Sequence, residues 1–347
     1  MRAVSMHMVA GPDPRITLVV PCWNAGSHLR PLVESLLAQT ETSARLVLVD
    51  DGSDDGSAAL ARECGRGRME VLVNERRLGL AANWNRCAEL VDTRFFALAH
   101  MDDVYEPDFA ATLADVLDER PAGAAAHCMA RGIDSHGAAI DAPQERMKRR
   151  AWSGLDRADR ATVYRRLLRS NFIAAPGVVW RTAVFREFGG FDPRLRFALD
   201  WDASFRALLA GYELIGVPRA LVHYRRHDAS ATAALGGGVE RYREEAEVAA
   251  AAHARGAAAG LISAATKPSR AALDHLLYDV LLDLEGGRAD AARTKLFFAR
   301  TSLPGGARDP RRACVAAAAR CGRFGCAALR AGFELFLALR APRVHSA

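Results

Sequence analysis

Apolar runs alternate with segments of helical spacing along the first hundred residues. Four short, nearly continuous apolar runs have the length of buried strands, and they lie at 15–21, 45–50, 69–74 and 94–100. The segments between them repeat apolar residues every three or four positions, and they lie at 27–39, 55–64 and 80–91. Strands alternating with helices form right-handed βαβ units. We therefore predict an α/β fold with a mostly parallel sheet flanked by helices.

The regular pattern lapses after Ile133 and resumes near residue 158. The stretch from 134 to 154 has the composition of a loop. Beyond it, the spacing predicts a helix, a strand, a second helix and then a pair of short strands. These elements lie at 158–170 and 200–211 for the helices, and at 172–180 and 212–225 for the strands.

A turn-rich stretch at 235–238 precedes a part of the chain that is helical in pattern throughout, with a helical hairpin near 270–300. We therefore divide the chain into three parts. These are a disordered leader at 1–13, an α/β domain at 14–235 and a helical region at 236–347.

The net charge of +6 is concentrated at the end of the 347-residue chain. Residues 301–347 hold eight arginines against Asp309 and Glu334, so the rest of the chain is neutral. On a helix, four of the arginines lie opposite an apolar stripe, at 312, 320, 323 and 330. Such a tail either lies on an anionic bilayer surface or packs on the α/β domain with its arginines in water.

The remaining composition points to an ordinary globular protein. The seven cysteines show no C-x-x-C spacing, and neither a signal-peptide core nor a spanning apolar run is apparent. We expect a cytoplasmic protein, with peripheral contact at the inner face of the plasma membrane through the tail. Nucleic acid is not an expected partner, because the basic tail lacks interleaved aromatic residues.

Polar residues cluster where the four predicted strands end. In a parallel sheet the carboxyl ends of the strands share one edge, and ligands bind there. The polar groups lie at 21–24, 50–53, 74–77 and 100–103. We therefore expect these four turns to form one site.

Paired carboxylates give that edge its candidate chemistry. Asp50 or Asp51 could accept hydrogen bonds from a nucleobase or a ribose, or could simply belong to a solvated turn. Asp102 and Asp103 offer the oxygen ligands that Mg²⁺ or Mn²⁺ prefers when bridging to phosphates. The alternative is an acidic loop that favours the N-terminus of the helix beginning near Pro107.

Two later motifs carry further candidates. Asp200 and Asp202 open a predicted helix after a glycine-rich turn, where one could act as a general base and one as a helix cap. His227 follows the last predicted strand and is either a metal or phosphate contact or an ordinary strand-end residue.

In order and spacing, these motifs together resemble the family 2 glycosyltransferases, which have the GT-A fold and invert configuration at the transferred sugar. The matching segments are VVPCWN (19–24), VDDGSDD (49–55), NERRLGLAANWN (74–85), HMDD (100–103), GGFDPRL (189–195), LDWDASFRALLAG (199–211) and YRRH (224–227). The resemblance covers roughly residues 14–230, so it implies a GT-A catalytic domain at 14–235.

The resemblance also implies roles for individual residues. Those lining the nucleoside pocket would be Pro21, Trp23, Asn24, Asp50 or Asp51, and Arg76 or Arg77. Asp102 would meet the ribose or the metal, Asp103 would ligate the metal, and His227 would add a metal or phosphate contact. Asp200 falls on the position of the base, with Asp202 as the alternative.

The implied reaction moves a sugar from a UDP-, GDP- or dTDP-sugar to a hydroxyl of a saccharide or lipid-linked saccharide, with Mg²⁺ or Mn²⁺, in bacterial surface polysaccharide or glycolipid synthesis. One base without a protein nucleophile gives inversion. Two residues depart from the family pattern, since His100 replaces the first Asp of the metal motif and Leu199 replaces a Glu. These departures leave a non-catalytic sugar-nucleotide-binding protein as an alternative. A nucleotidyltransferase fits less well, because no lysine follows the first strand.

Overall fold

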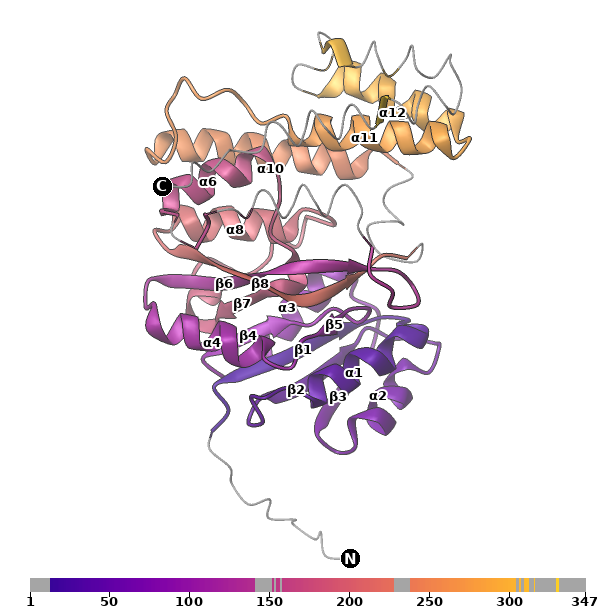
Figure 1. Ribbon diagram of the computed structural model, residues 1–347, viewed down its shortest axis with the longest axis vertical. Coiled ribbons are helices and arrows are strands. Elements are labelled where there is room, and N and C mark those ends of the chain that lie inside the picture. Colours follow the sequence, from indigo (N-terminus) through magenta and orange to yellow (C-terminus); the bar gives the residue numbers. More distant parts are fainter. Residues whose placement is uncertain are drawn as a thin grey trace, which may run out of the picture.

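Figure 1 shows the computed structural model of the protein. It describes residues 13–140, 152, 154–156, 158–227, 238–303, 306, 309–311, 315, 329 and 330. The predicted leader up to residue 12, part of the predicted 134–154 loop and most of the basic tail lie outside the described residues. The roles predicted for those segments therefore stay predictions.

The described chain forms one eight-stranded sheet in the order β3-β2-β1-β4-β7-β6-β8-β5. The strands are β1 (Ile16–Cys22), β2 (Arg45–Asp50), β3 (Met69–Val73), β4 (Phe95–Leu98), β5 (Val104–Tyr105), β6 (Gly123–Ile133), β7 (Val178–Arg181) and β8 (Glu213–Arg225). The first four pair in parallel, as predicted. β7 pairs antiparallel with both β4 and β6, and β6 pairs parallel with β8. The sheet is therefore mixed but mostly parallel.

Helices cover both faces of this sheet. They are α1 (Leu29–Leu37), α2 (Ser57–Gly65), α3 (Leu80–Glu89), α4 (Phe109–Glu119), α6 (Arg160–Arg169), α7 (Thr182–Glu187), α8 (Leu199–Leu209), α10 (Glu240–Ala258), α11 (Ala271–Glu285) and α12 (Ala289–Ser302), with short 3₁₀ turns η1 (Gly26–His28) and η2 (Ala175–Gly177). Alternate residues of β1 face opposite cores. Leu18 and Val20 meet α1, α2 and α4, whereas Val19 meets the core shared by α3, α6 and α8.

The strands that the sequence analysis missed have weak patterns. β6 begins with Gly-Ala-Ala-Ala, which carries little strand propensity, and β5 is only two residues long. The segment predicted as two short strands forms one long strand, β8, whose pairing with β6 has register shifts. Pairing with neighbouring strands, on both sides for β6 and β8 and with β8 alone for the edge strand β5, therefore makes these segments strands.

The C-terminal helices pack above the sheet, with α8 next to it and α12 farthest away (Figure 1). α10 packs on α6 and α8, and its Val248 and Ala252 share their core. α11 and α12 add a separate core around Leu276 and Leu277, to which α10 contributes Tyr242. Within the described residues, no helix is long and apolar enough to span a membrane.

Candidate functional site

A cavity of 2280 Å³ opens at the carboxyl ends of β1, β2 and β4 and extends to α10 and α11. Its wall includes the turns after β1 and β4, the start of α3, the N-terminus of α8 and the facing side chains of the C-terminal helices. A pocket for one small ligand is roughly 300–1,000 Å³. This cavity is therefore large enough for two ligands side by side.

The turn after β1 supplies an aromatic platform. The guanidinium of Arg77 lies 3.5 Å from the centre of the exposed Trp23 ring. Asn24 has a left-handed backbone (φ 50°), and its side chain and Asp54 exchange hydrogen bonds that fix this turn against the turn after β2. Pro21, Trp23, Asn24 and Arg77 line the cavity, whereas Arg76 is exposed and is not part of its wall.

The carboxylates after β2 both hold loops. Asp50 is buried and accepts hydrogen bonds from the backbone N–H and the hydroxyl of Ser53. Asp51 accepts hydrogen bonds from the side chain of Asn74 and from the backbone N–H groups of Leu78 and Gly79. Asp51 lines the cavity and Asp50 does not. Of the two alternatives, Asp51 is therefore the one within reach of a ligand.

The adjacent carboxylates after β4 point to different surroundings. Asp102 lines the cavity, and its Oδ2 accepts a hydrogen bond from Nε2 of His227 at 2.8 Å. Burial opposes ionisation of Asp102, yet the hydrogen bond from His227 keeps the pKa of Asp102 below the ordinary value. Asp103 is fully buried and accepts a hydrogen bond from the backbone N–H of Arg225 at 2.8 Å. Asp103 thus ties the turn to β8.

His100 brings a nitrogen donor to the same turn. Its Nε2 atom is buried and has no hydrogen-bond partner in the described part of the chain, and its ring lies 5.0 Å from that of Trp84. Burial lowers the pKa of His100 to about 4, so the ring is neutral at physiological pH and one of its two nitrogens has a lone pair.

These groups have the composition of a divalent metal site. One ligand atom each from His100, Asp102 and Asp103 lie within 4.8 Å of one another. Carboxylate oxygens suit Mg²⁺ and Mn²⁺, and a neutral imidazole suits Mn²⁺ better than Mg²⁺. The buried nitrogen without a partner and the ionised Asp102 therefore fit a bound cation. His227 is hydrogen-bonded to Asp102 and so orients this carboxylate.

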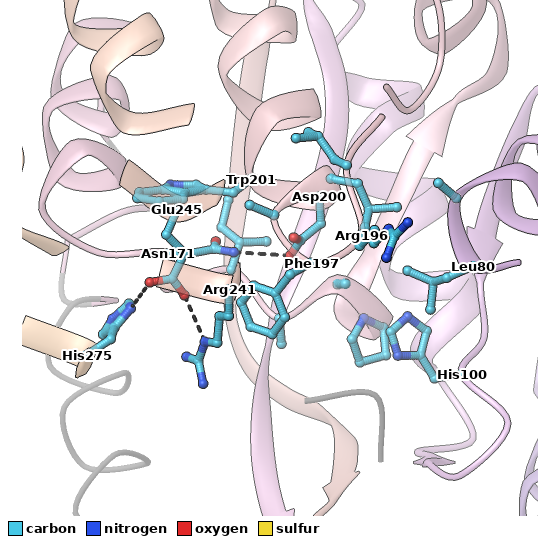
Figure 2. Close-up of a pocket in the computed structure, with 18 of the residues that line it drawn as sticks. Leu80, His100, Asn171, Arg196, Phe197, Asp200, Trp201, Arg241, Glu245 and His275 are labelled. Atoms are coloured by element: carbon cyan, nitrogen blue, oxygen red, sulfur yellow. Dashed lines mark hydrogen bonds and ion pairs between the residues drawn. The ribbon is translucent and has the colours of Figure 1, made fainter. Parts of the chain in front are cut away.

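The start of α8 separates its two carboxylates. Asp200 faces the cavity, and its Oδ2 accepts a hydrogen bond from Nδ2 of Asn171 at 3.1 Å (Figure 2). Asp202 is buried away from the cavity and pairs with Nε of Arg206 at 2.6 Å. Only Asp200 is therefore placed to touch a ligand, whereas Asp202 stabilises the helix.

Helix α10 forms the wall facing α8. Glu245 accepts hydrogen bonds from His275 of α11 at 2.9 Å and from Arg241 at 3.0 Å (Figure 2). Although burial opposes it, pairing with His275 and Arg241 lowers the pKa of Glu245 to about 2. Burial also opposes protonation of His275, yet Glu245 raises its pKa above the ordinary value. The sequence analysis singled out none of these residues, since their proximity requires α10 and α11 to fold against α8.

Comparison with known proteins gives a family match over part of the chain and a shared fold. Residues 17–169 match the family described as glycosyl transferase family 2. A Mycobacterium tuberculosis protein described as uncharacterized is 28% identical over 233 residues, which cover 66% of this chain and 72% of that protein. The uncharacterized glycosyltransferase YibD of Escherichia coli is 29% identical over 110 residues, which cover 30% of this chain and 32% of YibD.

Solved structures share the architecture at low identity. The mannosyltransferase PcManGT of Pyrobaculum calidifontis, in complex with GDP-Man and Mn²⁺, matches with a TM-score of 0.53 and 16% identity over 95% of this chain and 88% of its own. S. aureus TarS 1–349, in complex with UDP-GlcNAc, matches with a TM-score of 0.55 and 16% identity over 94% of this chain and 90% of its own. The fold is the predicted GT-A fold.

Proposed function

We propose that this chain, whose residues 17–169 match glycosyl transferase family 2, is a glycosyltransferase of that family. It moves a sugar, with inversion and with the help of a divalent metal, from a nucleotide-diphosphate sugar to a hydroxyl acceptor. The observation that carries the proposal is one cavity lined by Trp23, Asp51, Asp102 and Asp200. It provides a nucleoside platform, a metal-binding carboxylate and a separate base.

The donor occupies the part of the cavity next to β1, β2 and β4. Trp23 offers a ring for the nucleobase or sugar to stack on, and Asp51 offers a carboxylate near the nucleoside. His100 and Asp102 would hold Mn²⁺ or Mg²⁺, with Asp103 and His227 fixing the turn that carries them. When bound, the metal supplies positive charge that stabilises the leaving diphosphate. PcManGT with GDP-Man and Mn²⁺ supports this arrangement by analogy.

Asp200 acts as the general base. The acceptor hydroxyl oxygen attacks the anomeric carbon while the bond from that carbon to the diphosphate oxygen breaks, and the proton passes to Asp200. This attack comes from the face opposite the diphosphate, which inverts the anomeric centre. Asp202 takes no part, because Arg206 already pairs with it.

The acceptor occupies the part of the cavity between α8 and the pair α10–α11. We propose a saccharide acceptor, since polar and aromatic side chains such as Arg241, Tyr278 and Phe197 line this part. A lipid-linked saccharide and a role in a surface polysaccharide or glycolipid pathway of a bacterium stay part of the proposal. Membrane contact at the cytoplasmic face would involve the basic tail, most of which lies outside the described residues.

Release of nucleotide diphosphate from a panel of UDP-, GDP- and dTDP-sugars tests the proposal. Slow transfer to water reports even without the acceptor, so the assay needs only the protein, the donor and Mn²⁺ or Mg²⁺. We expect release from one donor that chelator, Asp102→Asn or Asp200→Asn reduces at least a hundredfold. Calorimetric donor binding without release, with saccharides added, would instead favour the non-catalytic binding protein. Absence of both binding and release would refute the proposal.

A further inference from the structure

Asn171 lies between α6 and η2, and the mechanism above gives it no part. Its side-chain Nδ2 donates a hydrogen bond to Oδ2 of Asp200 at 3.1 Å, and both side chains line the cavity (Figure 2). The next two residues, Phe172 and Ile173, are buried in the core. Asn171 is therefore presented to Asp200 by an anchored backbone.

The side-chain amide of Asn171 is oriented so that its nitrogen, and not its oxygen, faces the carboxylate of Asp200. Oδ1 of Asn171 is buried and has no hydrogen-bond partner among the described residues. Leaving such an oxygen unsatisfied costs free energy. Turning the amide would not remove this cost, because it would aim Oδ1 at the carboxylate and place two acceptors against each other. The observed arrangement thus suits an ionised Asp200.

A contrasting asparagine shows what a structural role looks like in this chain. Asn85 of α3 donates from Nδ2 to the carbonyl of Phe191 at 2.8 Å and accepts from the N–H of Phe191 at 2.9 Å. Both ends of its amide are satisfied by backbone. Asn171, in contrast, directs its donor at a side chain that faces the cavity.

We propose that Asn171 is a positioning residue, which holds Asp200 ionised and in the rotamer that faces the acceptor hydroxyl. This inference rests on the proposed role of Asp200 as the base. A hydrogen bond to the charged form of a carboxyl group favours that form, so loss of Asn171 makes Asp200 easier to protonate. As the pH falls, Asp200 would then become protonated, and so stop acting as a base, at a higher pH than in the wild type.

Two measurements test the proposal in the full chain, and only the release assay includes Mn²⁺ and the donor that supports release. The first titrates the carboxyl carbons of ¹³C-aspartate-labelled protein by NMR, without metal or donor, and assigns the Asp200 signal from Asp200→Asn. We expect its midpoint to rise by about 1 in Asn171→Ala and by more in Asn171→Asp, which adds an acidic group. The second follows nucleotide-diphosphate release against pH. Its acid limb should move upward by the same amount, with the donor KM within about twofold.

Asn85→Ala is the matched control, expected to lower thermal stability and to leave both pH midpoints in place. An Asp200 midpoint that does not move in either Asn171 variant overturns the proposal, and so does an equal movement in Asn85→Ala. The NMR titration needs no turnover. A wild type without nucleotide-diphosphate release therefore overturns the proposed function, whereas an unmoved titration in an active enzyme overturns only the role of Asn171.

Discussion

Neighbouring carboxylates in this protein take different tasks because their side chains enter different surroundings. Asp102 faces the cavity, whereas Asp103 turns inward to the backbone of β8. The same division separates Asp200 from Asp202, which pairs with Arg206. Asp103 fixes the backbone of its turn, and the ion pair of Asp202 with Arg206 stabilises the helix that carries Asp200. In both acidic pairs, therefore, one carboxylate faces the cavity and the other stabilises the surrounding structure.

Separate substitutions of Asp102 and Asp103 should distinguish metal binding from structural stabilisation. Asp102→Asn should weaken Mn²⁺ binding to the nucleotide-loaded protein at least tenfold while leaving the melting temperature nearly unchanged, because it removes a charged ligand from the cavity wall. Asp103→Asn should lower stability by about 1–3 kcal/mol, because it weakens a buried hydrogen bond to β8. Calorimetry and thermal denaturation measure the two effects. A stable Asp103→Asn protein that no longer binds Mn²⁺ would show instead that Asp103 is a direct ligand.

At the scale of elements, α10 completes the N-terminus of α8. The cap residue of α8, Ala198, has no side chain that could accept a hydrogen bond. Glu244 of α10 accepts hydrogen bonds from the backbone N–H groups of Arg196, Phe197 and Ala198 instead. A residue 46 positions later in the chain therefore holds the segment that leads into Asp200.

Glu244→Ala should accordingly destabilise the protein by about 1–2 kcal/mol, the usual effect of removing a helix cap. It should also slow nucleotide-diphosphate release, since Asp200 lies in the first turn that Glu244 supports. Urea denaturation and the release assay measure the two effects. Glu247→Ala, an exposed change on the same helix, is the control and should alter neither.

The contact between α10 and α11 should make stability depend on pH in two windows. The pKa of Glu245 is lowered to about 2, so its contribution is complete above about pH 4–5 and is lost as the pH falls toward 2. The pKa of His275 is raised, so its contribution is present below about 6.5 and is lost as the pH rises through the raised value. Stability from this pair is therefore greatest between these windows.

His275→Gln tests the alkaline window. Denaturant midpoints at pH 5.5 and 8.5 should differ less in this variant than in the wild type, because glutamine does not titrate. His136→Gln, a change on an exposed turn, should retain the wild-type difference. Equal pH dependence in all three proteins would contradict the assignment.

At the scale of the molecule, α10 joins the sheet domain to the outer helices. It shares a core with α6 and α8 on one side and with α11 and α12 on the other. It packs closely on α6 at Gly256, where an added Cβ would lie 2.4 Å from Cε1 of the buried Tyr164. The absence of a side chain at Gly256 therefore allows α10 to pack on α6 at this distance.

Gly256→Ala should push α10 away from α6 and destabilise the protein by about 1–3 kcal/mol, despite the better helix propensity of alanine. Thermal denaturation measures the loss, and Ala254→Ser on the exposed side of the same helix is the control. A Gly256→Ala protein that is more stable than the wild type would show that α10 does not pack on Tyr164 as described.

The sequence by itself determined the local features. Apolar runs placed β1 to β4 and the parallel sheet, and the strand-end rule gathered Trp23, Asp51 and Asp102 at one edge, because parallel strands end on the same side. Tertiary structure decided what local pattern does not encode. It made a strand of the alanine-rich β6 by pairing it on both sides, and it chose Asp200 over Asp202 as the side chain facing the cavity. It also brought Asn171, from the loop after α6, and Glu245, from α10, to the site, because burial of apolar faces, and not chain proximity, sets how these segments pack.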